Sequence, residues 1–314
     1  MKKSLVILLS LLLVISLFSS CANTSDEITD DGRPTVVTTT FPVYDWTRNI
    51  AGDRCNVIYL DKSGADMHSF EPTASVIATI AEADVFIHIG GVSDEWVDSA
   101  LKAAGNEDLI KLSLMSAITV LEEETVDGMQ IHHDESEDEE ADEHIWLSLK
   151  KASESTYAIC STLCKADSDN ADFYKANTEA YTKKLSALDS SFASLMSSAK
   201  RNTILVADRF PFRYLAEDYG IEYFAAFPGC SAESEASFET ITFLINKTKE
   251  LSLPCILVTE SSDGSLADTI NGETGAKILT LNSCQSVKQA DIDNGLTYLS
   301  AMESNLSTLT EALG

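Results

Sequence analysis

The 314-residue sequence predicts an α/β protein with two doubly wound lobes that are joined by one long helix. Three observations lead to this prediction. Strand-like and helix-like segments alternate from Pro34 onward, which is typical of parallel sheets covered by helices. A stretch with few breakers at 167–200, with apolar residues at helical spacing, interrupts this alternation, which then restarts. About 290 residues follow an N-terminal leader, too many for one typical domain and enough for two.

The first lobe is expected at 34–166 and alternates between the two kinds of segment. Residues 34–52 predict a β-branched strand, a turn and a helix, and a second strand follows from Cys55 into a loop. Pro72 is expected to open the next helix, since proline is tolerated in a first helical turn. The remaining segments are strands at 84–91, 108–113 and 117–124, helices at 92–105 and 144–166, and an acidic loop at 122–143.

The second lobe is expected at 201–314, after a linker helix at 167–200. Its strands are predicted at 202–208, 221–227, 254–261 and 276–283, and its helices at 211–220, 231–253, 265–275 and 291–313. The alternation again predicts a parallel sheet with helices on both faces.

The N-terminus reads as an export signal and not as a membrane span. Lys2 and Lys3 precede an apolar run at 5–18, which is shorter than the roughly 18 residues that a span requires. Residues 1–20 are therefore a predicted signal peptide. The residues before Cys21 resemble a lipobox of bacterial lipoproteins, which implies a diacylglycerol on the Cys21 sulfur, a flexible tether at 21–33 and a lipid-anchored position outside the cell membrane. An ordinary cleaved signal is the alternative.

The net charge and the cysteines limit the kinds of partner and binding site that this protein can have. A net charge of −28 argues against nucleic acid as a partner and favours cations. Six cysteines besides Cys21 show no CxxC spacing, and export permits disulfides whose connectivity the sequence leaves open. Cys160 and Cys164 share a helix face, where they could bind a soft metal or simply pack as small buried residues.

A histidine-rich acidic stretch points to a metal. Residues 131–146 hold three of the five histidines of the chain and eight carboxylates. Imidazole nitrogen suits zinc and copper, and carboxylates raise the local concentration of cations. We expect His132 and His133 to coordinate a metal weakly and pass it on, with a merely solvated loop as the alternative.

Metal-competent side chains follow several predicted strands. Ligands of open α/β sheets bind at the carboxyl ends of strands. The residues at or after such ends are His68, His144, Asp208, Glu260 and Asn282. They come from both lobes and predict a metal site in the cleft between them. His88 lies within an apolar run and is expected to be a core histidine.

Two segments carry a resemblance to a known family. Residues 66–91, with His68 followed by Phe-Glu-Pro-Thr, resemble the first metal-binding segment of the zinc and manganese solute-binding proteins of ABC transporters. Residues 142–159 resemble the second segment, with Glu143 and Leu149 in place of two prolines, and 167–200 resembles the linker helix. The resemblance implies that His68 and His144 are nitrogen ligands of one bound ion.

The second lobe departs from the family pattern. Arg209 falls where the third ligand is expected, and a guanidinium has no lone pair to offer. Asp208 could replace it, or could pair with Arg209 instead. The fourth ligand falls on Asn282, an amide that binds zinc weakly, and Glu260 could contribute.

Together these features predict a monomeric extracytoplasmic protein that captures Zn²⁺ and delivers it to an ABC permease, and that is not an enzyme. Manganese is the alternative metal, because oxygen donors in the second lobe would tolerate it. A surface adhesin of the same family is a second alternative. A secreted zinc hydrolase is a third, although the sequence has no HExxH motif.

Overall fold

Two parallel four-stranded sheets form the framework of the protein, as the sequence predicts. The computed structural model describes residues 31–64, 70–130, 141–231 and 235–314. The first sheet has the order β2-β1-β3-β4, and the second has the order β6-β5-β7-β8. The strands are β1 Thr35–Thr38, β2 Asn56–Tyr59, β3 Val85–His88, β4 Ile110–Ser113, β5 Thr203–Phe210, β6 Glu222–Pro228, β7 Cys255–Val258 and β8 Lys277–Thr280.

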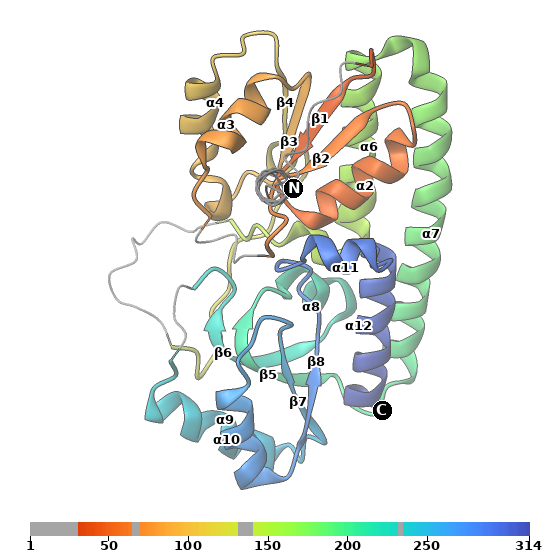
Figure 1. The fold of residues 1–314 in the computed structure, drawn as a ribbon. Coiled ribbons are helices and arrows are strands. Elements are labelled where there is room, and N and C mark those ends of the chain that lie inside the picture. The colour runs from red at the N-terminus through yellow and green to blue at the C-terminus, as the bar shows by residue number, and fades with distance from the viewer. Residues whose placement is uncertain (1–30, 65–69, 131–140, 232–234) are drawn as a thin grey trace, which may run out of the picture. The chain divides into compact units, whose positions relative to one another are not determined.

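Helices follow almost every strand (Figure 1). In the first lobe they are α2 Phe41–Ala51, α3 Ala74–Ala81, the 3₁₀ turn η3 Val92–Asp94, α4 Val97–Ala104, α5 Leu114–Ala117, η4 Ile145–Leu147 and α6 Leu149–Ala166. The 3₁₀ turn η5 Ser168–Asn170 leads into the long α7 Ala171–Ser198. In the second lobe they are α8 Arg213–Tyr219, α9 Phe238–Glu250, α10 Ser265–Thr274, α11 Gln289–Asp293 and α12 Tyr298–Leu313.

Both sheets reverse their strand order at the same point. The second strand of each lobe lies on one side of the first, and the third lies on the other side. All the strand pairs are parallel. In such sheets the loops at the carboxyl ends of the strands diverge at the reversal point and leave room for a ligand. The fold therefore places the loops after β1, β3, β5 and β7 where a binding site is expected.

Side-chain caps set where several helices begin. The Thr73 hydroxyl accepts a hydrogen bond from the backbone N–H of Val76, so α3 starts at Ala74 and Pro72 lies just outside it. Ser148 caps α6 and Ser237 caps α9 in the same way. Each cap satisfies one of the backbone N–H groups that a helix leaves without an internal partner.

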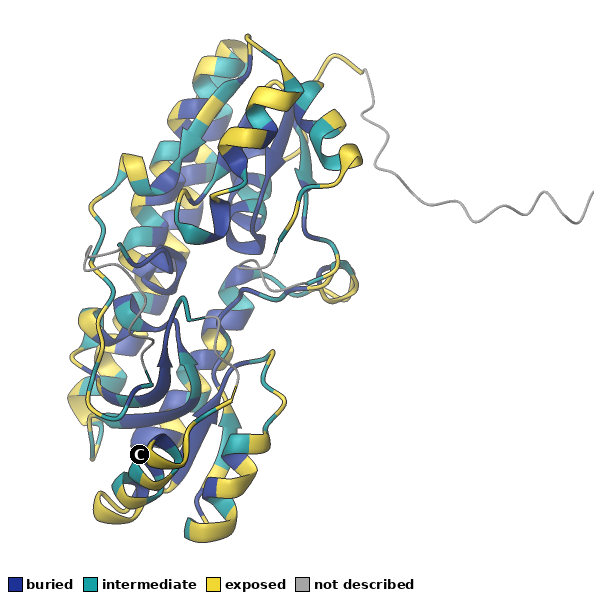
Figure 2. Cartoon of the chain, turned by 90° about the vertical axis from the view of Figure 1, so that its left-hand side faces the viewer, coloured by how far each residue is buried: buried dark blue, intermediate teal, exposed yellow. Residues whose placement is uncertain are grey.

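The apolar core continues from one lobe into the other. One face of each sheet has a core of its own, under α3 and α4 in the first lobe and under α9 and α10 in the second. The opposite faces share a single cluster, which also takes in residues of α2, α6, α7, α8 and α12. Figure 2 shows the strands buried and the exposed residues gathered on the outer helices. Residues 31–314 accordingly form one compact unit.

Buried polar contacts join the two lobes beside this core. The indole Nε1 of Trp146 donates to the carbonyl of Ser283 at 2.7 Å. The hydroxyl of Tyr298 donates to the carbonyl of Trp146 at 2.6 Å, and the backbone N–H of Tyr298 donates to Asp45. These bonds fix the segment that begins α6 against the second lobe.

The structure corrects three predicted elements. Residues 117–124 do not form a strand; α5 ends at Ala117, and only an isolated bridge joins Glu122 to Ala141. The helix predicted at 231–253 begins only at Phe238, after its cap at Ser237. The C-terminal helix is broken into α11 and α12 near Gly295, whose φ of 97° lies outside the helical region.

Tertiary hydrogen bonds explain why residues 117–124 leave the first sheet. The backbone N–H of Leu121 donates to the Tyr214 hydroxyl at 2.9 Å, and that hydroxyl donates to the carbonyl of Asp142 at 2.8 Å. Further along, the backbone N–H of Gln130 donates to the carbonyl of Ala226 in β6. The segment therefore lies on the second lobe as far as Gln130.

The cysteines and the helices bear on two further predictions. Cys55, Cys160, Cys164, Cys230, Cys255 and Cys284 are all free thiols. Cys160 is buried in the shared core, and Cys164 is half-buried next to it on α6, which fits the packing interpretation of this pair.

In the ranges that the structure describes, no helix has the length and apolar character to cross a membrane.

Candidate metal centre

His144 lies fully buried immediately before η4, which starts at Ile145. Its Nδ1 lies 2.9 Å from Oδ1 of Asp142, and its backbone N–H donates to the same oxygen at 2.8 Å. The ring also makes an edge contact with Trp146, with centroids 5.2 Å apart. A proton on Nδ1 that faces a carboxylate fixes the tautomer in which Nε2 carries the lone pair. His144 is thus oriented to coordinate a metal through Nε2.

The charge around His144 is strongly negative. Burial alone would lower the pKa of this imidazole, but Asp142, Glu143 and Glu123 outweigh burial and raise the pKa above its ordinary value. The same carboxylates would favour a divalent cation at this place. A metal ion that binds His144 would therefore replace a proton on the imidazole, which these carboxylates already stabilise.

Three ligand-type side chains converge beside this ring. Among the described residues, one group of three His, Cys, Asp or Glu side chains brings its ligand atoms within 4.8 Å of one another: Glu143, His144 and Cys230. Tetrahedral zinc bound at about 2.0–2.3 Å to each ligand holds ligand atoms roughly 3.3–3.8 Å apart. The group is therefore compact enough to close on one ion after small side-chain movements.

Glu143 is held in place by the first lobe. Its Oε2 accepts a hydrogen bond from the backbone N–H of Ser93 at 2.8 Å, and its Oε1 accepts one from the Ser93 hydroxyl. A side chain at Gly91 would collide with Glu143, so this close approach of the chain requires glycine. The carboxylate, which is fully buried, is thereby fixed in position beside His144.

Cys230 reaches the group from the second lobe. It follows β6, and its backbone N–H donates to Oε1 of Glu123 at 2.9 Å. The preceding Gly229 lies against the histidine, since a Cβ there would be 3.0 Å from Cε1 of His144. Burial raises the pKa of the Cys230 thiol, and Glu143, Glu123 and Asp142 raise it further. In the absence of a cation, the group is therefore a neutral thiol.

The sequence predictions for the site have different outcomes. Four of the residues lie outside the part of the chain that the structure describes: Cys21, His68, His132 and His133. His144 lies in the convergent group. His88 is partly buried at the end of β3, with its Nδ1 3.4 Å from Oδ2 of Asp94. The ring also packs against Phe86, with centroids 5.5 Å apart, but this Nδ1 makes no hydrogen bond to a described residue.

The predicted ligands of the second lobe are not part of the convergent group. Glu260 and Asn282 follow the ends of β7 and β8, but Asp208 lies within β5, which continues to Phe210. Oδ1 of Asp208 accepts the backbone N–H of Arg209, and Oδ2 accepts the Thr259 hydroxyl at 2.5 Å. The Glu260 carboxylate accepts the backbone N–H of Ser283 at 2.7 Å and further donors from the same loop. The backbone N–H of Asn282 donates to Asn305. Any metal bound to these carboxylates would share them with donors already in place.

The sequence reasoning missed two members of the group. The sequence analysis treats Glu143 as a substitute for a proline and as one of eight carboxylates in the acidic stretch, and Cys230 as a possible disulfide partner. One signal could have found Cys230, because it follows the predicted strand at 221–227 and so lies at a carboxyl end. Its approach to His144 depends on how the two lobes pack, which no local pattern encodes.

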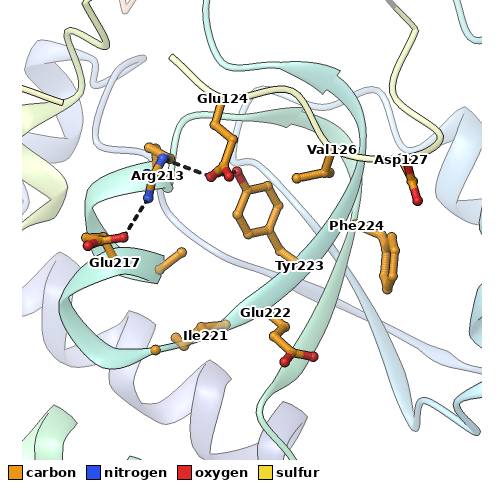
Figure 3. Close-up of a pocket in the computed structure, with 11 residues that line it drawn as sticks. Glu124, Val126, Asp127, Arg213, Glu217, Ile221, Glu222, Tyr223 and Phe224 are labelled. Carbon is orange, nitrogen blue, oxygen red and sulfur yellow. Dashed lines mark hydrogen bonds and ion pairs between the residues drawn. The ribbon is translucent and has the colours of Figure 1, made fainter. Parts of the chain in front are cut away.

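An open pocket of about 500 Å³ lies under the segment that leads to the histidine-rich stretch (Figure 3). Three of its charged groups form ion pairs with one another. Arg213 contacts Glu124 at 3.0 Å and Glu217 at 3.1 Å, and the Tyr223 hydroxyl donates to Glu124 at 3.0 Å. None of the residues of the convergent group lines this pocket, so it is separate from the candidate metal centre.

Comparison with known proteins identifies relatives over nearly the whole chain. The chain is 32% identical over 295 residues to the zinc-binding lipoprotein AdcA of Streptococcus pneumoniae, covering 93% of this chain but only 58% of that protein. It is 30% identical over 306 residues to the high-affinity zinc uptake system protein ZnuA of Bacillus subtilis, covering 95% of this chain and 94% of that protein. The chain thus spans little more than half the length of the first of these relatives.

Solved structures share the fold. The zinc-bound ZnuA-like domain of Streptococcus pneumoniae AdcA superposes with a TM-score of 0.75 at 30% identity, over 90% of this chain and 99% of that one. The metal-dependent lipoprotein YcdH of Bacillus subtilis superposes with a TM-score of 0.76 at 29% identity, over 90% of this chain and all of that one.

A family model covers both lobes and the linker helix. The model described as zinc-uptake complex component A, periplasmic, matches residues 36–312. That range includes Glu143, His144 and Cys230. The family consists of uptake components and not of enzymes, which excludes the hydrolase alternative. The chain belongs to the zinc-uptake complex component A family.

Proposed function

We propose that this protein captures zinc outside the cell membrane and delivers it to an ABC permease. The observation that carries the proposal is the environment of His144, whose Nδ1 is bound to Asp142 and whose ring lies in a group with Glu143 and Cys230. A buried imidazole oriented by a carboxylate is the usual arrangement of a histidine that binds zinc. The names of the relatives support zinc as the ion.

The ligand set of this proposal centres on two histidines. His144 provides one nitrogen, and we propose that His68 provides another, as the resemblance of its segment implies. Asp208, Glu260 and Asn282 stay sequence predictions. The carboxylates of Asp208 and Glu260 already accept hydrogen bonds, which a metal would share or replace.

Zinc is favoured over manganese by the donors near His144. Imidazole nitrogen suits zinc, whereas manganese prefers carboxylate, carbonyl and water oxygen. Glu143 is an oxygen donor that either ion would accept. Because the two ions differ in their affinity for nitrogen, two histidine ligands should favour zinc.

The proposal also includes the place and the partners of the protein. We propose that a lipid on Cys21 holds a monomeric protein at the outer face of the membrane, where it can meet its permease. His132 and His133 would then bind zinc weakly and pass it to His144. The closeness of these histidines to His144 in the sequence supports this proposal.

Titration of chelator-stripped protein with zinc tests the central claim. We expect one tight site in the native protein and its loss in a double His68→Ala, His144→Ala variant. A His132→Ala, His133→Ala variant should keep the tight site and lose only weak binding. Equal zinc affinity in the native protein and in the first variant would refute the proposal.

Uptake by cells tests delivery separately from binding. Cells that lack this protein should accumulate less ⁶⁵Zn at low external zinc, and the native gene should restore uptake. A gene with the two histidine substitutions should not restore it. Normal uptake in cells without the protein would leave zinc binding intact but would contradict the transport role.

A further inference from the structure

We propose that Cys230 is a zinc ligand, and that its sulfur makes the site select zinc over manganese. This inference rests on the proposed zinc-binding function and goes beyond it, since it assigns a thiolate to a site for which the resemblance implies two histidines. The S–H bond of the thiol would break as the Zn–S bond forms, and the proton would pass to solvent.

The position of Cys230 supports this role. Its sulfur lies within 4.8 Å of ligand atoms of both Glu143 and His144, although it comes from the other lobe. Two contacts keep it there: the hydrogen bond from its backbone N–H to Glu123, and the close approach of Gly229 to the His144 ring. The absence of a Cβ at Gly229 lets this turn approach the imidazole and brings Cys230 beside it.

The charges around Cys230 also favour a cation. An oxygen of the Glu143 carboxylate lies within 4.8 Å of the sulfur, and the Glu123 carboxylate accepts the hydrogen bond from the Cys230 backbone N–H. A divalent ion would neutralise this negative charge, and it is the kind of group that converts a buried thiol into a thiolate. The Arg209 side chain, which lies at the position where the third family ligand is expected, contacts the carbonyl of Ser231 at 3.4 Å, next to Cys230. Cys230 thus supplies a donor in the lobe where the expected one is missing.

The ligand set has a consequence for selectivity. Sulfur is a soft donor that binds zinc well and manganese poorly, whereas oxygen donors tolerate both ions. When Cys230 is a ligand, zinc gains a favourable sulfur donor and manganese does not. Substitution of Cys230 should therefore reduce the affinity for zinc and leave the affinity for manganese almost unchanged.

Cobalt and zinc titrations of the full chain test the proposal. Cobalt bound to native protein should give the near-ultraviolet thiolate-to-metal charge-transfer band, and Cys230→Ser should abolish that band. Cys164→Ser is the matched control, because Cys164 is also a half-buried free thiol and should leave the band intact. Zinc affinity in Cys230→Ser should fall about 100-fold, because a neutral hydroxyl, a much poorer donor to zinc, replaces the thiolate.

X-ray absorption at the zinc edge gives a readout that needs no variant. Zinc bound to the native protein should show a Zn–S distance near about 2.3 Å. If native protein binds zinc tightly without the cobalt band and without this Zn–S distance, the assignment of Cys230 is wrong and the zinc-binding function stands. If native protein binds neither metal, both proposals fail.

Discussion

Oδ1 of Asp142 accepts hydrogen bonds from both the ring and the backbone nitrogen of His144, at 2.9 and 2.8 Å. The two bonds fix the tautomer and the direction of the imidazole before a metal arrives. A carboxylate that orients a histidine ligand in this way raises its basicity as well.

The first prediction concerns this carboxylate. Asp142→Asn should lower zinc affinity by about 10–100-fold, the usual effect of losing the partner of a metal-binding histidine. Competition against a zinc chelator of known affinity measures it. Circular dichroism and the Tm of the stripped variant serve as the control for folding. An affinity equal to that of the native protein would mean that Asp142 does not orient the ligand.

The second prediction concerns the close approach of Gly229. In Gly229→Ala the new Cβ would lie 3.0 Å from Cε1 of His144 and 3.0 Å from the carbonyl of Phe210. We expect about 1–3 kcal/mol less stability, from overpacking, together with weaker zinc binding because the ring must move. Urea unfolding and chelator competition measure the two effects.

A glycine with free space gives the matched control. Gly272 lies inside α10, and a Cβ there would meet no atom within 4 Å. Gly272→Ala should raise the free energy of unfolding by about 0.5–1 kcal/mol through helix propensity and should leave zinc binding unchanged. If both alanine variants behaved alike, the contact between Gly229 and His144 would not matter.

The third prediction concerns Tyr214, whose hydroxyl joins Leu121 and Asp142. Tyr214→Phe leaves a largely buried N–H and a carbonyl without this partner, which should cost about 1–3 kcal/mol in the free energy of unfolding. Tyr157→Phe is the control, because Tyr157 is 54% exposed and its loss should change stability by less than about 0.5 kcal/mol. Urea denaturation of both variants decides the matter, and equal midpoints would contradict the role of Tyr214.

The fourth prediction concerns pH. The Tyr174 hydroxyl donates to Oδ2 of Asp167 at 2.6 Å and lowers the pKa of that carboxyl. A carboxyl whose pKa is lowered by folding stabilises the protein above the pKa of the unfolded chain, and the contribution is lost as the pH falls through the folded pKa. Asp167→Asn should therefore cost about 1 kcal/mol at pH 7, the lower end for a charged hydrogen bond because solvent screens a half-buried group.

The same comparison at acid pH completes the test. The difference between native protein and Asp167→Asn should shrink progressively below about pH 4, where the unfolded carboxyl takes up its proton. Guanidinium unfolding at pH 7, 5 and 3 measures the difference. A gap that stayed constant over this range would show that the hydrogen bond does not depend on the charge of Asp167.

Periodicity predicted the fold well because both lobes are built from buried parallel strands and amphipathic helices. The strand at 84–91 and the long helix at 167–200 were recognisable from local pattern alone, and β3 and α7 lie within them. The error at 117–124 has a different origin, since the β-branched residues there suit a strand but Tyr214 of the second lobe binds the backbone of Leu121 instead. Local propensity cannot anticipate a partner that is 93 residues away.

The candidate site was predictable only in part for the same reason. His144 was found because its segment resembles a known motif. Cys230 was not found, since nothing near it in the sequence marks it as a ligand and its distance to His144 is set by tertiary packing. Arg209 is the opposite case. Its guanidinium has no lone pair to offer a metal, so the sequence alone excludes it as a ligand in any fold.

The apolar cluster that runs from the first sheet through α7 to the second sheet has a mechanical consequence. Swinging the lobes apart as rigid halves would wet a large hydrocarbon surface at roughly 25 cal/mol for each Å². Under the proposed function, we expect zinc to leave through slight loosening of the segment before η4, which carries Glu143, and of the loop after β6, which carries Cys230. A wide opening of the molecule is not needed for this. The ion would then lose one donor at a time.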